Sequence, residues 1–263
     1  CCTACVQEKE VLREYDEIDE ASLLEEVLGE GMVPLPDILD LSTEFTALLD
    51  SRIASKWSSR HKLDELRKLL YGKDNLNIQY DASNTLAATE TLKVKSGNCL
   101  SLTGLFIASA RHVGLDAHYR TVAVDPMWNH DGNTMIRYEH IIATGTLAAG
   151  ETYVMDFLPE FVVEDMRTML ITDEEALSLY FNNLGAEAIV EQRIDDAIDN
   201  LRSAIKLQPD FPDAWNNMGA AMRRAGNYQL AEFSYLRALS QQESNYSALG
   251  NLSQLYTYMG RTE

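Results

Sequence analysis

Long apolar runs are missing from this chain of 263 residues, although 46% of its residues are hydrophobic. No stretch approaches the roughly 20 consecutive apolar residues that a membrane-spanning helix requires. We therefore expect a soluble globular protein with a sizeable core. At about 100–150 residues per domain, the length suits two units.

Basic residues are scarce relative to acidic ones, with 22 Lys and Arg against 41 Asp and Glu and a formal net charge of -19. Binding phosphates requires clustered Lys and Arg, so this composition argues against a nucleic-acid partner. It also argues against adhesion to an anionic membrane surface through charge. Ten of the acidic residues lie between Gln7 and Glu30, a run typical of a solvated helix face.

Cysteine is rare as well, and its placement excludes a disulfide framework and a zinc site. Cys1, Cys2 and Cys5 crowd the first residues, so Cys99 is the only internal thiol among the four cysteines. Such a lone cysteine is either a buried structural residue or a reactive one. Its surroundings in the sequence must decide between the two.

The first five residues, Cys-Cys-Thr-Ala-Cys, resemble the remnant of a bacterial lipoprotein signal, in which a small residue precedes the lipidated cysteine. Cys1 and Cys5 are the candidates for lipidation. The apolar segment that would distinguish such a signal from an arbitrary start lies outside this sequence. The resemblance implies that residues 1–6 tether the protein to the periplasmic side of a bacterial cell envelope; without lipidation the protein would be soluble.

The next part of the chain, residues 7–170, reads as helices followed by strands. Apolar spacing and capping residues predict helices over 7–30, 42–54, 61–71, 83–94 and 99–113. Alternating residues predict strands over 117–124, 134–144 and 151–158, with a loop over 125–133. This order indicates an α+β domain of helices plus an antiparallel sheet.

From about residue 172 the sequence repeats itself at an interval of 34, which aligns Gly185 with Gly219 and Ala197 with Ala231. Small residues at these positions let two helices approach closely. The period and the pattern resemble tetratricopeptide repeats, each a helix-turn-helix. Residues 171–263 are therefore predicted to form an all-α solenoid of two repeats and a partial third.

Tetratricopeptide repeats imply a peptide or protein partner. Asn183, Asn217 and Asn251 recur at the repeat interval, and their side-chain amides are candidates for holding a peptide backbone. Asn is also common in the first helix of such repeats, which favours a purely structural role for this column.

Cys99 lies in the first turn of its predicted helix, where the partial positive charge and free N–H groups favour a thiolate. The backbone N–H groups at Asn98 and Leu100 are candidates for an oxyanion hole. A thiol nucleophile also needs a base. His140, inside a predicted strand, is the best candidate.

The other histidines are weaker candidates for the base. His112 lies roughly 20 Å from Cys99 along the same helix, and His118 lies just beyond Gly114, where that helix ends. His61 reads as a surface residue, and His130 lies in the predicted loop. His130 is the alternative if His140 proves unsuitable.

The stretch Gly97-Asn98-Cys99, followed by Gly114-Leu115-Asp116-Ala117, resembles the nucleophile helix of the transglutaminase-like superfamily, which has a papain-like Cys-His-Asp fold. The resemblance covers roughly residues 75–160. It implies acyl transfer or amide hydrolysis on a peptide or cell-envelope substrate. Cys99 would attack a carbonyl, His140 would shuttle protons and Asp156 would orient the imidazole, with no metal or cofactor needed.

The spacing of His140 and Asp156 predicts their geometry, because the two positions are symmetric about Ala148. A hairpin with this register pairs the two residues directly, so that Asp156 bonds one nitrogen of His140 and the other nitrogen faces Cys99. The alternative function is a non-catalytic scaffold, in which the thiol domain is degenerate and the repeats bind a protein partner.

Overall fold

The computed structural model describes residues 19–30, 33–131, 134–157 and 167–261, the side chains of 123–131 and 134–139 excepted. It is a mixture of helices and a small antiparallel sheet, followed by helices alone. The helices are α2 (Glu20–Leu28), α3 (Thr43–Arg52), α4 (Ser59–Tyr71), α5 (Ala88–Val94), α6 (Cys99–His112), α7 (Asp173–Val190), α8 (Ile194–Leu207), α9 (Pro212–Arg224), α10 (Tyr228–Gln241) and α11 (Tyr246–Tyr258). The strands are β1 (Gln79–Tyr80), β2 (Ser96–Gly97), β3 (His118–Asp131), β4 (Thr134–Thr146), β5 (Thr152–Met155) and β6 (Thr168–Ile171).

Side-chain caps start three of the N-terminal helices, as the sequence predicts. The hydroxyl of Ser42 accepts from the Phe45 N–H at the start of α3, and that of Ser58 caps α4 in the same way. Asn98 caps α6. Each cap satisfies an N–H that has no partner within its helix, so the predictions of helices over 42–54, 61–71 and 99–113 are confirmed.

The predicted helix over 83–94 is only partly correct, because the helix α5 begins at Ala88. The preceding residues bond to α6 instead. Leu86 N–H donates to Ser101 Oγ at 2.7 Å, and that hydroxyl donates to the Asn84 carbonyl at 3.2 Å. Of the helix predicted over 7–30, the described part contains α2 at Glu20–Leu28, and residues 7–18 lie outside the described residues.

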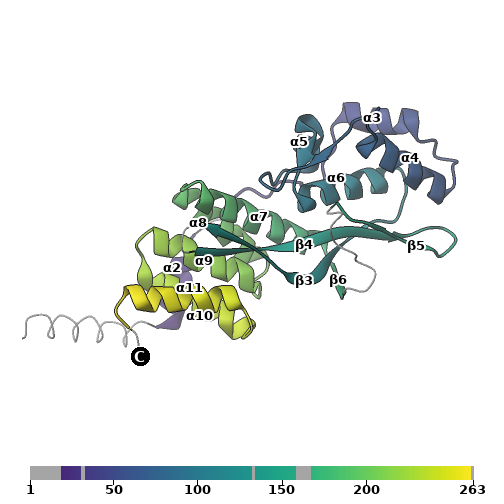
Figure 1. The fold of residues 1–263 in the computed structure, drawn as a ribbon. Coiled ribbons are helices and arrows are strands. Elements are labelled where there is room, and N and C mark those ends of the chain that lie inside the picture. Colours follow the sequence, from purple (N-terminus) through teal and green to yellow (C-terminus); the bar gives the residue numbers. More distant parts are fainter. Residues whose placement is uncertain (1–18, 31–32, 132–133, 158–166, 262–263) are drawn as a thin grey trace, which may run out of the picture.

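The sheet has four antiparallel strands in the order β5-β4-β3-β6. Figure 1 shows the long β3–β4 ribbon running between the group α3–α6 and the C-terminal helices, where β4 packs against α9 and α11. The prediction of a loop over 125–133 is wrong, since β3 continues to Asp131. Pairing with β4 is interrupted between Val122 and Met127, and Pro126 lies in that interruption, where its missing N–H breaks no ladder bond.

The register of the β4–β5 hairpin differs from the predicted one by two residues. Thr144 pairs with Val154 and Thr146 with Thr152, so the turn is longer than predicted. In this turn the Leu147 N–H donates to the Glu151 carbonyl, and the Gly150 N–H donates back to the Leu147 carbonyl, both at 2.8 Å. A shift of two residues keeps every side chain on its predicted face.

The C-terminal part is helical, as predicted: the described residues from 172 to 261 form α7 to α11 and contain no strand. Adjacent helices pair closely through small residues. A methyl group added to Gly185 would lie 2.5 Å from Leu201 Cγ and 3.3 Å from the Ala197 carbonyl oxygen. The close approach of two helices that was predicted at Gly185 and Ala197 is therefore confirmed. In the part of the chain that the structure describes, no helix has both the length and the apolar character needed to cross a bilayer.

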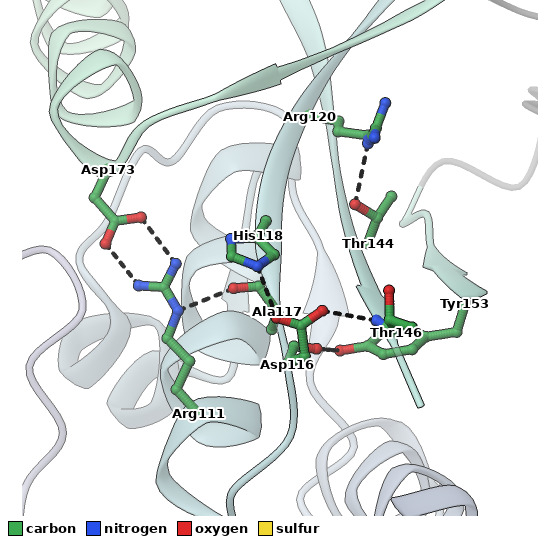
Figure 2. Close-up of polar contacts among 9 residues, drawn as sticks. All are labelled: Arg111, Asp116, Ala117, His118, Arg120, Thr144, Thr146, Tyr153 and Asp173. Atoms are coloured by element: carbon green, nitrogen blue, oxygen red, sulfur yellow. Dashed lines mark hydrogen bonds and ion pairs between the residues drawn. The ribbon is translucent and has the colours of Figure 1, made fainter. Parts of the chain in front are cut away.

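A polar network joins the end of α6 to the sheet and to the first helix of the repeats (Figure 2). The guanidinium of Arg111 binds both carboxylate oxygens of Asp173 at 2.6 and 3.0 Å and donates to the Ala117 carbonyl at 2.9 Å. Such bidentate pairs fix geometry as well as charge. Because Asp173 begins α7, the network ties the helix of Cys99 to the repeats.

Candidate functional site

Three residues from separate elements lie together at the N-terminal end of α6. Cys99 is the first residue of α6 and is 7% exposed, while His140 is fully buried on β4. Asp156 directly follows β5, and its Oδ2 lies 3.0 Å from His140 Nε2. The predicted hydrogen bond between these side chains is confirmed, although the register that was expected to produce it was wrong.

The electrostatics of His140 link all three side chains. Burial is the largest influence on this imidazole and lowers its pKa, since it disfavours the charged form. Hydrogen bonds to Asp156 and Cys99, with the negative charges of both groups, outweigh burial and raise the pKa of His140 to about 9. The ring is therefore protonated at neutral pH, and a cation beside a thiol favours the thiolate.

The helix α6 is anchored on both sides of Cys99. Asn98 Oδ1 accepts from the Ser101 N–H at 3.0 Å, and Thr103 Oγ1 donates to the Ile141 carbonyl on β4 at 3.4 Å. The N–H of Asn98, predicted as an oxyanion donor, already donates to the Asn84 carbonyl at 2.9 Å. Leu100, the other predicted donor, lies in the first turn, where N–H groups have no acceptor within the helix.

A cleft of about 570 Å³ opens beside Asp156 and is lined by residues of α4, β1 and α6 and by Phe157. Tyr80 lines this cleft, and sequence reasoning missed it. Burial, followed by the charges of Cys99 and Asp81, raises the pKa of Tyr80 to about 12. Tyr80 approaches Cys99 because β1 pairs in parallel with β2, which puts Tyr80 opposite Gly97. Strands of two residues carry no recognisable sequence signal.

The other histidines with described side chains are engaged elsewhere. His112 Nε2 lies 2.9 Å from Asp50 Oδ1, and His118 Nε2 lies 2.7 Å from Asp116 Oδ1. His61 packs edge-on against a tryptophan, with ring centroids 4.2 Å apart. The side chain of His130, the alternative base, lies outside the described residues, as do the lipidation candidates Cys1 and Cys5.

The asparagine column of the repeats is buried. Asn183, Asn217 and Asn251 all lie in the interior, with Asn217 and Asn251 fully covered. Asn217 Nδ2 donates to Asn182 Oδ1, and Asn251 Nδ2 donates to Asn216 Oδ1, both at 2.9 Å. These amides join the first helices of successive repeats, which agrees with the structural role that the sequence favours for them.

Replacing Asn217 by Leu is expected to destabilise the protein by about 1–3 kcal/mol, because it removes the donor to the buried Asn182 Oδ1 and the acceptor of the buried Asn216 Nδ2. Urea denaturation measures this change. Alkylation of Cys99 in the folded variant is expected to match wild type. A variant of unchanged stability would contradict a role in joining the repeats.

A half-buried carboxyl lies where the repeats meet the thiol domain. Glu187 of α7 accepts a hydrogen bond from Thr85 Oγ1 at 2.6 Å. Burial chiefly, with the charge of Glu191, raises the pKa of Glu187 to about 7, although the bonds from Thr85 and the charge of Arg193 oppose this shift. A raised pKa means that the protonated form stabilises the fold. This contribution is complete below about pH 4.5 and is lost as the pH rises through about 7.

Glu187→Gln is therefore expected to be more stable than wild type by about 1–2 kcal/mol at pH 8, allowing for the partial exposure of the carboxyl. The two proteins are expected to be equally stable below pH 4.5. His140 also loses stabilising protonation as the pH rises, but it is common to both proteins and cancels. Urea denaturation across this pH range measures the difference, and replacement of the exposed Glu243 by Gln serves as the control. Equal stability at pH 8 would contradict the assignment.

Comparison with known proteins identifies the C-terminal helices. A family model described as a TPR repeat matches residues 191–226, which span α8 and α9. The chain is also 36% identical over 59 residues to "Tetratricopeptide repeat domain-containing protein PYG7, chloroplastic" of Arabidopsis thaliana, a match that covers 22% of this chain and 20% of that protein. No solved structure matches the chain. The C-terminal region is thus a tetratricopeptide region, and the family match does not extend to Cys99.

Proposed function

We propose that this protein is a thiol-dependent acyltransferase or amidase of the transglutaminase-like type, with Cys99, His140 and Asp156 as its catalytic triad. The observation that carries this proposal is the fully buried His140, bonded to Asp156 at 3.0 Å and interacting with Cys99 at a helix N-terminus. Acidic partners also occur at His112 and His118, so the thiol beside His140 is what distinguishes it from them.

In the proposed reaction, Cys99 Sγ attacks a carbonyl carbon of the substrate as a thiolate. The protonated His140 gives its proton to the departing amine, and a thioester forms on Cys99. His140 then takes a proton from water or an incoming amine, which attacks the thioester and releases the thiolate. Asp156 holds Nε2 of the ring throughout, which leaves Nδ1 for the thiol and the leaving group.

The substrate is proposed to enter along the cleft beside Asp156, where Tyr80 and Phe157 offer apolar surface to a peptide or cell-envelope substrate. The N–H groups of the first turn of α6, with that of Leu100 among them, are the proposed oxyanion donors. The repeats from about residue 171 onward are proposed to bind a peptide or protein partner. A lipid on Cys1 or Cys5 would hold the protein at the periplasmic side of a cell envelope.

The second candidate function is a non-catalytic interaction scaffold, and the comparisons favour it. The match to the TPR repeat at 191–226 supports protein binding and carries no information on catalysis. In this alternative Cys99 is a core residue of a degenerate domain, and the low exposure of its thiol is simply packing.

Alkylation with iodoacetamide at pH 6 distinguishes the two functions. Mass spectrometry of peptides, on protein prepared without a lipid, compares Cys99 with Cys1, Cys2 and Cys5, which serve as ordinary thiols in the same tube. An ordinary thiol with a pKa near 8.5 is almost wholly protonated at pH 6 and reacts slowly. The enzyme proposal requires Cys99 to react at least about tenfold faster than these three. A Cys99 that reacts only after denaturation would favour the scaffold.

A further inference from the structure

A chain of three hydrogen bonds connects the first repeat helix to the cap of α6. Thr85 Oγ1 donates to Glu187 Oε1 at 2.6 Å, and Asn98 Nδ2 donates to Thr85 Oγ1 at 2.6 Å. Asn98 Oδ1 then accepts from the N–H of Ser101 at 3.0 Å. Asn98 and Thr85 are both buried. The chain thus begins on α7 and ends in the first turn of the helix that carries Cys99.

The direction of these bonds is set at Glu187. Glu187 Oε1 accepts from the Thr85 hydroxyl, which thereby uses the one proton that it can donate. The Thr85 oxygen is then left to accept, and the NH₂ group of Asn98 turns towards it. This orientation leaves Asn98 Oδ1 as the atom that faces α6, and only an oxygen can cap the N–H groups there.

Other charged groups near Glu187 do not provide the same contact. Glu191 and Arg193 act on Glu187 through their charge, and Tyr180 of α7 is influenced by Glu187 and by Glu90 of α5. Arg193 is itself held by ion pairs to Glu191 and Asp196. Thr85 is the residue of the thiol domain that bonds Glu187 directly.

We propose that Glu187 is a positioning residue for Cys99, acting through Thr85 and Asn98, so that the first repeat helix sets the reactivity of the thiol. This inference rests on the proposed thiol chemistry. It assigns a function to the contact between Glu187 of the repeats and Thr85 of the thiol domain, namely control of the reactivity of Cys99. Movement of α7 relative to Thr85 changes the cap of α6 and hence the environment of the thiolate.

The test compares the alkylation rate of Cys99 by iodoacetamide from pH 5 to pH 9 in wild type, Glu187→Leu and Glu187→Gln. The Leu variant removes the acceptor and is expected to slow the reaction at pH 7 about tenfold, because Thr85 and Asn98 no longer hold the cap of α6 in place. The Gln variant keeps an acceptor oxygen and is expected to restore most of the rate. Thr85→Val and Thr85→Ser form a second pair with the same expectation.

Glu191→Leu is the matched control, since it changes charge and size at the same end of α7 without touching Thr85, and it is expected to leave the rate unchanged. Circular dichroism confirms that each variant is folded at the temperature of the assay. If Cys99 is reactive in wild type and reacts at the same rate in Glu187→Leu, the positioning role alone is overturned. A wild-type Cys99 no more reactive than Cys1, Cys2 and Cys5 would instead overturn the thiol chemistry.

Discussion

Replacing His140 by Asn is expected to lower the alkylation rate of Cys99 at pH 6 by about 100-fold. A thiol with an ordinary pKa near 8.5 is less than about 1% thiolate at that pH, whereas a thiol paired with an imidazolium is largely ionised. Because the pKa of His140 is raised to about 9, the ring carries its positive charge at pH 6. Asn has no positive charge to offer, so the variant falls back to ordinary thiol behaviour.

The pH profile separates the role of Asp156 from that of His140. In Asp156→Asn the ring keeps its place but loses an anion that raises its pKa, so the pH range in which Cys99 reacts faster than an ordinary thiol is expected to end at lower pH than in wild type. His112→Asn is the control, because His112 pairs with Asp50 instead. An unchanged Cys99 rate in His140→Asn would remove the triad and leave Cys99 as a core residue.

The parts of the site that were predictable from the sequence depend on local signals. The cap at Asn98 and the run of helix formers after it predict α6, and the structure begins that helix at Cys99. The repeats were predictable for a related reason. Contacts between neighbouring repeat helices, such as that between Gly185 and Leu201, join residues close in the chain, and the same contact recurs one interval later between Gly219 and Tyr235.

The hairpin that carries His140 and Asp156 was predictable only in part. Alternation fixes which face of a strand a residue occupies, and the structure keeps both side chains on one face. The register depends on the turn, and the turn of Leu147 to Glu151 is closed by backbone hydrogen bonds that symmetry about Ala148 did not anticipate. The His140–Asp156 bond survives because a two-residue shift preserves the face.

What the sequence could not predict depends on contacts between distant segments. Tyr80 reaches the neighbourhood of Cys99 through a parallel bridge of two residues, and Thr85 meets Glu187 across 102 positions of chain. No composition or period marks such pairs before the fold brings them together. The extension of β3 past Pro126 is similar, since a proline is read as a break unless the pairing partner is known.

Among the described glycines of the thiol domain, Gly145 of β4 has the least room for a side chain, and it lies five residues from His140. A methyl group added there would lie 1.9 Å from the Asp116 carbonyl oxygen and 2.7 Å from the ring of Tyr153. That carbonyl is held in place, because Tyr153 Oη donates to it at 2.5 Å and the Asp116 carboxylate accepts from the Thr146 N–H at 2.8 Å (Figure 2). Backbone and side chain of Asp116 are therefore both fixed against the strand.

Gly145→Ala is expected to lower the free energy of unfolding by about 3 kcal/mol or more, since the methyl group must displace backbone and not a flexible side chain. Urea denaturation measures the loss. Gly150→Ala is the matched control: that glycine has a φ of +81° but nothing within 4 Å, so strain alone is expected to cost about 1 kcal/mol. If the two variants lose equal stability, the contact with Asp116 is not tight. If Gly145→Ala folds but its Cys99 loses reactivity, the displaced strand has moved His140 away from the thiol. That result would show that the contact between Gly145 and Asp116 sets the position of β4.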